Sequence, residues 1–233
     1  MRVVATTSSG AKARSSVEVS VRSGSVRISV GEVDVPVIVS GTATIDDNGV
    51  VAASPSSTIE LVCPRGTDVF VATASGSVSC RGPLGSVRLS TKSGRLDVET
   101  CSEADLRTSS GRVVVGHVQD RCRVTAGSGS VTVGSASDLE ITTRSGSVEA
   151  GGVRDGRVHA ASGRIIVSCV TPGEVEIRTM SGNVNVSCVG DWAPLTELHA
   201  RRPKVVVDDL RRETREGVLR VSTLSGSIKV RPA

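Results

Sequence analysis

Histidine and carboxylate side chains are the groups of this chain that could act in acid–base chemistry, so their spacing is considered first. His117, His159 and His199 fall at different positions of the repeat described below, which predicts that they do not share one column. Enzymes on β-helices need clustered carboxylates, a basic side chain or a histidine beside a substrate groove. With one Phe, one Trp and no Tyr, the chain also lacks aromatic platforms for sugar rings. We therefore expect no enzyme and no catalytic residue, and a carbohydrate-active β-helix enzyme is the third of three interpretations.

Metal and thiol chemistry are not indicated either. The six Cys contain no CxxC pair, and the acidic stretch Asp46-Asp47-Asn48-Gly49 lacks the spaced ligands of a calcium loop, so a turn before Val50 is expected. No metal and no cofactor are predicted. Cys169 and Cys188 occupy the same place in adjacent repeats, within reach of a disulfide, although free thiols are favoured in a reducing compartment.

Composition and charge exclude several partners. The net charge of +4 comes from scattered Lys and Arg, which predicts no nucleic-acid binding in a chain without stacking aromatic residues. No run of about 18 apolar residues is present, so no membrane span is expected. The N-terminus lacks the apolar run of a signal peptide, which favours a cytoplasmic location; association with a surface has no support from the sequence.

The elements that position all these side chains follow from an internal repeat. Ser-Gly followed by a small or polar residue and then by Val, Ile or Leu recurs nine times at intervals that are mostly 17–19 residues. The repeated glycines are predicted structural corners: Gly24, Gly76, Gly94, Gly111, Gly129, Gly146, Gly163, Gly182 and Gly226.

Alternation of apolar and polar residues on both sides of each glycine predicts two short strands per repeat. The third, fifth and seventh residues before the glycine, and the second and fourth after it, are expected to face inward. Strands this short are buried only by stacking copy on copy. The sequence therefore predicts an all-β fold, a single right-handed parallel β-solenoid (β-helix) of about twelve rungs of 17–19 residues.

Two columns test this register. Six residues before each glycine, charges of alternating sign predict pairing between rungs: Arg88, Asp105, Arg123, Glu140, Arg157, Glu176 and Arg220. Three residues before the glycine, a threonine column is expected to form a hydrogen-bonded ladder inside the solenoid: Thr73, Thr91, Thr108, Thr143, Thr179 and Thr223.

The repeat divides the chain into segments. We expect an N-terminal cap at 1–16, degenerate rungs at 17–66, regular repeats at 67–190, a charged insertion with one irregular rung at 191–217 and a final rung at 218–233. One degenerate rung would place Ala43 and Ile45 inward, and another would bury Ile59 and Leu61. In the irregular rung the expected inward pair is Val205 and Val207.

The pattern VxVxTxSGxVxVxxxxG, led in by the Cys63–Val69 turn, resembles the bacterial putative-adhesin family of β-strand repeat proteins, a domain-of-unknown-function family. The resemblance is best over Ser56–Ser187. It implies a β-solenoid with a non-enzymatic surface or scaffold role, and it brings no catalytic residue to transfer. The chain departs from the family's frequent Ser-Gly-Asp, with Ser77, Arg95, Arg112, Ser130, Ser147, Arg164, Asn183 and Ser227 in place of the aspartate.

The first interpretation is therefore a binding or scaffold module for an unknown protein or envelope partner. Its predicted partner-binding residues lie mostly in the insertion: Trp192, Arg201, Arg202, Arg211, Arg212 and Arg215. The second interpretation is a self-polymerising scaffold of the bactofilin type. It rests on the C-terminal rung, which is expected to present a bare strand edge for self-association.

Overall fold

The computed structural model describes residues 4–6, 15–41, 43–45, 51–53, 58–169, 173–188, 193–200, 203–207 and 215–232. It gives the backbone alone at 4–6, 43–45, 51–53, 169, 193–195, 200, 203–205, 207 and 215–216. The chain folds as two compact units, 1–119 and 120–233, and each is described by itself. Within the described residues, no helix has the length and apolar character needed to cross a bilayer.

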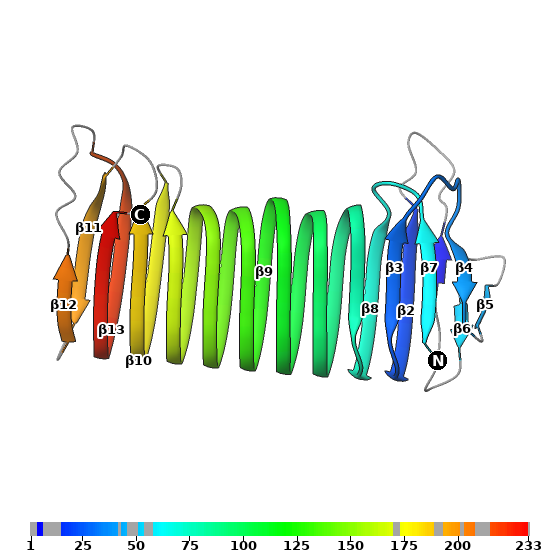
Figure 1. Cartoon of the computed structure of the whole chain (residues 1–233), viewed down its shortest axis with the longest axis horizontal. Coiled ribbons are helices and arrows are strands. Elements are labelled where there is room, and N and C mark those ends of the chain that lie inside the picture. The colour runs from blue at the N-terminus through cyan, green and yellow to red at the C-terminus, as the bar shows by residue number, and fades with distance from the viewer. Residues whose placement is uncertain are drawn as a thin grey trace. The chain divides into compact units, whose positions relative to one another are not determined.

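Strands make up the regular structure of both units. Unit 1 contains β1 (Val4–Thr6), β2 (Ser16–Ser23), β3 (Val26–Val30), β4 (Val37–Ser40), β5 (Ala43–Ile45), β6 (Val51–Ala53), β7 (Ile59–Cys63), β8 (Asp68–Ser75) and the first part of β9 (Val78–Cys169). Unit 2 contains the rest of β9 with β10 (Glu174–Cys188), β11 (Ala193–Ala200), β12 (Pro203–Val207) and β13 (Arg215–Pro232). The ribbon of β9 coils through successive turns (Figure 1).

Parallel pairing between successive turns makes the fold solenoid-like, as the repeat predicts. In unit 1, β8 pairs with β9 in parallel, Val69 opposite Val87. In unit 2, β10 pairs with β9 in the same way, Ile177 opposite Val158. The inward positions are buried, and apolar side chains of adjacent rungs stack on one another because the alternation has the same phase in each rung.

The corner glycines form a column of closely stacked backbones in each unit. All nine have positive φ angles, from +123° to +155°, which side chains with a Cβ rarely adopt. A Cβ added at Gly163 would collide with the carbonyl oxygen of Gly146, and one at Gly94 with that of Gly76. Glycine is thus required at these corners both by conformation and by the approach of the neighbouring rung.

The threonine column lies inside, but its hydrogen bonds differ from the expected ladder. The Thr91 hydroxyl donates to the carbonyl oxygen of Ser93 at 3.0 Å, and Thr143, Thr179 and Thr223 bond in the same way to the serine two residues on. The hydroxyls of Thr73 and Thr108 are buried without a partner. The bonds run along each rung to the serine carbonyl just before the corner glycine, so they support the corner rather than rung stacking.

Strands at the N-terminal end of unit 1 do not stack in chain order. β3 pairs in parallel with β9 along one edge and with β7 along the other. β7 therefore stacks on the far side of β3 from β9, although it comes later in the chain than β3. Ile59 and Leu61 of β7 are buried as expected. Two antiparallel strands cover the edges, β1 on β2 and β4 on β7, and the sheet is therefore mixed.

One expected rung of unit 1 is corrected. β5 pairs antiparallel with β6 in a two-stranded sheet of its own, so Ala43–Ile45 is not a parallel rung of the solenoid. The sequence offers a reason, since Asn48-Gly49 between these strands is a strong hairpin signal. The expected turn at Asp46–Gly49 lies outside the described residues.

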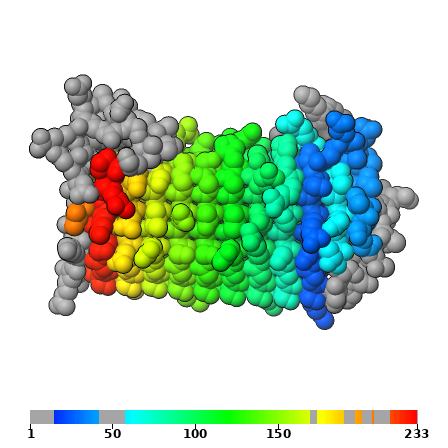
Figure 2. Space-filling model, viewed as in Figure 1, coloured from blue at the N-terminus to red at the C-terminus, as the bar shows by residue number. Residues whose placement is uncertain are grey.

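The C-terminal end of unit 2 is also out of chain order, which corrects the expectation of a bare final rung. β13 pairs with β10 along one edge and with β11 and β12 along the other. In Figure 2, the red residues of β13 border the yellow residues of β10. Both edges of β13 are therefore occupied, and self-association through that rung would have no free strand edge. A register shift at Ala193/Leu195 and Pro203 at the start of β12 make the outer rung irregular, which discourages further pairing. The side chains of Val205 and Val207 lie outside the described residues.

Substitution of the inward residue Val148, which is 1% exposed, tests the burial assignment in unit 2. Val148→Asp should lower the free energy of unfolding by roughly 3–5 kcal/mol, because it buries a carboxylate with no partner. The control Ser147→Asp adds the same charge one residue away at an exposed position and should change stability by less than about 0.5 kcal/mol. Urea unfolding followed by circular dichroism measures both, and equal effects of the two variants would contradict the inward assignment.

Candidate binding surface

Outward side chains of the rungs form columns one strand spacing apart, about 4.8 Å. In unit 2, the column six residues before the corner glycine keeps its alternating charge, with Arg157 opposite Glu176 and Glu176 opposite Arg220. Because β11 lies outside β13, Glu197 follows Arg220 and extends the alternation by one rung. The sequence analysis missed Glu197, since it placed the insertion before the final rung.

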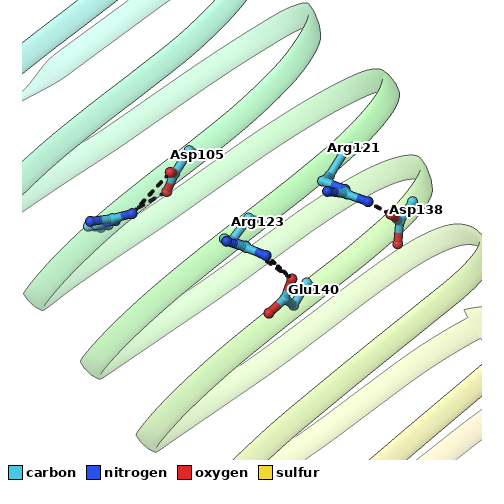
Figure 3. A network of polar contacts seen from close by, with 6 residues as sticks. Asp105, Arg121, Arg123, Asp138 and Glu140 are labelled. Carbon is cyan, nitrogen blue, oxygen red and sulfur yellow. Dashed lines mark hydrogen bonds and ion pairs between the residues drawn. The ribbon is translucent and has the colours of Figure 1, made fainter.

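Ion pairs between rungs hold part of this surface. Arg123 contacts Glu140 at 2.7 Å, and Arg121 contacts Asp138 at 2.9 Å on the same two rungs (Figure 3). Both pairs are exposed, so each contributes only about 0–1 kcal/mol. They order the side chains of this face more than they stabilise the fold.

Arg220 of unit 2 forms ion pairs with two carboxylates. Its guanidinium binds Glu197 at 3.0 Å on one side and Glu174 on the other. Side-chain hydrogen bonds with Glu197 and then Glu174 raise the pKa of Arg220 above its ordinary value. Glu176, which faces Arg220 in the ladder, pairs instead with Arg178 of its own strand. The column is in register, but its ion pairs are not all between rungs.

A groove of about 400 Å³ in unit 2 is lined by four carboxylates, from Asp138, Asp155, Glu174 and Glu176. Each carboxylate has a guanidinium partner, and Asp155 binds Arg154 at 2.9 Å while also accepting the backbone N–H of Glu174 at 3.0 Å. A glycosidase needs one carboxyl that stays protonated and one that is free to attack or to activate water. Carboxylates already matched with arginines do not provide that pair.

His159 and His199 share one column, which corrects the expectation from the repeat. In this column His159 lies opposite Arg178, Arg178 lies opposite Ser222, and Ser222 lies opposite His199. The sequence pattern missed this because β11 stacks outside β13. Three rung spacings, about 14 Å, separate the two imidazoles along the column, too far for them to act on one proton. No three His, Cys, Asp or Glu side chains in the described ranges lie close enough together to hold a metal ion.

Three thiols of unit 1 are buried and poorly reactive. Desolvation raises the pKa of Cys63 to about 12, and desolvation with a smaller contribution from Glu103 raises that of Cys101 to about 12. The pKa of Cys80 is also raised, by desolvation and then by the nearby thiols of Cys101 and Cys63. A thiol is nucleophilic as its thiolate, so none of these three is suited to catalysis.

Cations gather on the described corner edge of unit 1. We define this corner edge as the residues from two before to one after Gly24, Gly76, Gly94 and Gly111. It contains Arg22, Lys92, Arg95 and Arg112, all exposed, and no Asp or Glu. Arg95 binds Asp97 at 2.9 Å, whereas Arg22, Lys92 and Arg112 make no ion pair with any described residue. The sequence signal for this row, basic residues at fixed offsets from Ser-Gly, was present but not used.

The residues predicted for partner binding are not tested by the structure. Trp192, Arg201, Arg202, Arg211 and Arg212 lie outside the described residues, and Arg215 is described by its backbone alone at the start of β13. Cys169 and Cys188 are opposite one another in the β9–β10 ladder, as their spacing predicts. The side chain of Cys169 is not described, so the favoured free thiols at these two positions stay a prediction.

Comparisons with known proteins point to one family. Residues 4–196 match the family described as Toastrack DUF4097. No curated protein matches the sequence. Among solved structures, the chain is similar to a putative adhesin from Bacteroides fragilis, with 12% identity over 93% of this chain and 91% of that chain. The TM-score of 0.37 is too low to support an inference about fold or function.

The buried thiols predict an alkaline loss of stability. The pKa of each of these three thiols is raised in the folded protein above the ordinary value of 9.0. Below pH 9.0 the thiols are protonated in both the folded and the unfolded protein. Above pH 9.0 the unfolded protein loses its thiol protons first. The free energy of unfolding should therefore fall as pH rises from about 9 towards about 12, by up to about 1.4 kcal/mol per thiol and pH unit. No tyrosine titrates in this range. Urea unfolding of the wild type and of Cys63→Ala/Cys80→Ala/Cys101→Ala should show a shallower pH slope for the variant; identical slopes would contradict the assignment.

Proposed function

We propose that this chain, which belongs to the Toastrack DUF4097 family, is a non-enzymatic binding or scaffold module whose partner is an anionic polymer of the cell envelope. The observation that carries the proposal is the row of exposed cations on the corner edge of unit 1. The partner was left open by the sequence analysis between a protein and an envelope component, and the chemistry of this edge favours the second.

The spacing of the row suits a linear, repeating anion. Corner glycines of unit 1 stack directly, so Gly24 and Gly111 are three rung spacings apart, about 14 Å. Along this stack Arg22 is at one end, Arg112 at the other, and Lys92 is on a rung between them. Serine and glycine occupy most of the intervening positions, and their small side chains leave the edge open to a polymer chain. Three cations without partners raise the local concentration of a polyanion through their summed field.

Elsewhere on the described surface, several arginines are already paired with carboxylates, as Arg27 is with Glu60 at 2.6 Å and Arg107 with Asp105 at 3.2 Å. No aromatic side chain lies on the corner edge, so single-stranded nucleic acid would find no stacking platform there. These differences support the prediction that nucleic acid is not a partner.

Finer features of the fold and location are part of the proposal. We infer a right-handed coil of about twelve rungs, supported by the handedness common to parallel strand crossovers and by the spacing of the repeat. The insertion at 191–217 is proposed as a second contact region, supported by its charge density and its Trp192. The sequence predicts a cytoplasmic location, so the proposed polymer is one that is reached from the cytoplasmic face of the envelope.

The proposal is tested by the affinity for three linear polyanions, heparin, polyphosphate and polygalacturonate, measured by fluorescence anisotropy at several salt concentrations. Replacing the unpaired cations by Arg22→Gln/Lys92→Gln/Arg112→Gln should weaken binding about tenfold or more, because charge-assisted contacts are lost. The matched control Arg27→Gln/Arg107→Gln/Arg121→Gln removes three paired cations that are 62–63% exposed and should weaken binding less than about threefold.

Two outcomes would contradict the proposal. Equal losses in the two triple variants would mean that binding follows net charge and not the corner edge. Tighter binding of single-stranded DNA than of every polyanion in the panel would assign the edge to nucleic acid instead. Neutral dextran serves as the uncharged control polymer.

A further inference from the structure

Large apolar side chains are exposed in two places only within the described residues. The first is the stretch Val35, Val37 and Val39 in unit 1, with exposed fractions of 53%, 42% and 63%. The second is Met180 and Leu224 in unit 2, with exposed fractions of 60% and 53%. Grouped exposed apolar residues mark interaction sites more often than single ones do.

The patch in unit 1 is apolar and acidic. We call residues 32–39 the acidic valine segment, because Glu32 and Asp34 are both exposed and precede the three valines. Val37 and Val39 belong to β4, and Val35 lies in the bend just before this strand. Pro36 lacks a backbone donor, and contact through side chains is therefore favoured over strand addition.

The patch in unit 2 is apolar and basic. We call Arg144, Ala161, Met180 and Leu224 the methionine corner, since each residue is two positions before a corner glycine and these glycines stack in that order. Arg144 is exposed, and no described residue forms an ion pair with it. Beside Met180 is a groove of about 290 Å³ lined partly by Thr142, His159 and Ala161, which offers a recess for small apolar side chains.

The two patches match in charge, in apolar content and in order. Three rung spacings separate Arg144 from Leu224, about 14 Å, with the cation at one end and the large apolar residues at the other. In the acidic valine segment the two anions likewise come first and the valines follow. With Glu32 and Asp34 placed at Arg144, the valines would lie towards Met180 and Leu224.

We propose that the acidic valine segment of one copy of this chain docks on the methionine corner of a second copy. The contact is heterologous, because each copy uses a different patch, and it leaves one free patch of each kind at the ends of every complex. A dimer can therefore add further copies. This route to self-association needs no free edge on β13 and does not depend on polyanion binding.

The proposal is tested by sedimentation velocity on the full chain over a wide range of concentration. Wild type should associate as concentration rises, and Glu32→Lys/Asp34→Lys or Arg144→Glu/Met180→Ser should each weaken association by about tenfold or more. The control Arg22→Glu/Arg112→Glu reverses charges on the corner edge of unit 1 and should leave association unchanged. Circular dichroism verifies that each variant is folded.

Mixing the two variants separates this contact from other modes of association. Glu32→Lys/Asp34→Lys keeps an intact methionine corner, and Arg144→Glu/Met180→Ser keeps an intact acidic valine segment, so together they should form dimers and nothing larger. Each alone should associate about tenfold or more weakly than the wild type. Wild type that stays monomeric at every concentration, or a mixture that shows no dimer, would overturn the proposal, as would association that neither variant weakens.

Discussion

Close backbone stacking at the corner glycines is the constraint on which the rest of the structure depends. At Gly146, Gly163 and Gly182, positive φ angles turn the chain between two strands, and the carbonyl of one rung lies where a Cβ of the next would be. Because other residues rarely fit both conditions, glycine stacks on glycine along each column of corners. This stacking fixes the register of the strands on either side of these corners, and the outer rung departs from it, with Pro203 opposite Gly226.

Inward and outward columns follow from this register. Val, Ile, Leu and Cys fill a core that is thin enough to need almost no aromatic rings, and the chain has only one Phe and one Trp. Threonine hydroxyls near the corner bond to the serine carbonyl of their own rung, as Thr91 does to Ser93. Ion pairs such as Arg123 with Glu140 arrange the surface afterwards, at a small gain in stability.

The burial of individual side chains could be predicted from the sequence, because the alternation of apolar and polar residues and their distance from the Ser-Gly corner are properties of a single rung. The burial of Leu89, Ile141 and Ile177 followed from those two signals alone. Stacking order at the ends could not be derived in the same way, since aligning repeats assumes that neighbours in the chain are neighbours in space. β13 and β7 break that assumption, and with them the expectations for the histidines and for the C-terminal edge. The candidate surfaces were missed for a different reason. Whether Arg22 or Arg144 has a partner depends on residues in other rungs, which spacing does not reveal.

The position of β13 between β10 and β11 also affects how unit 2 is made on the ribosome. Synthesis proceeds from the N-terminus, so rungs of β9 and β10 can stack one after another as they emerge. β11 and β12 emerge before β13, yet their only parallel neighbour in the described structure is β13. The outer rung, formed by β11 and β12, therefore stays unpaired until residues 215–232 have left the exit tunnel. Vectorial folding stops at β10, and the last rungs assemble together in a single late step.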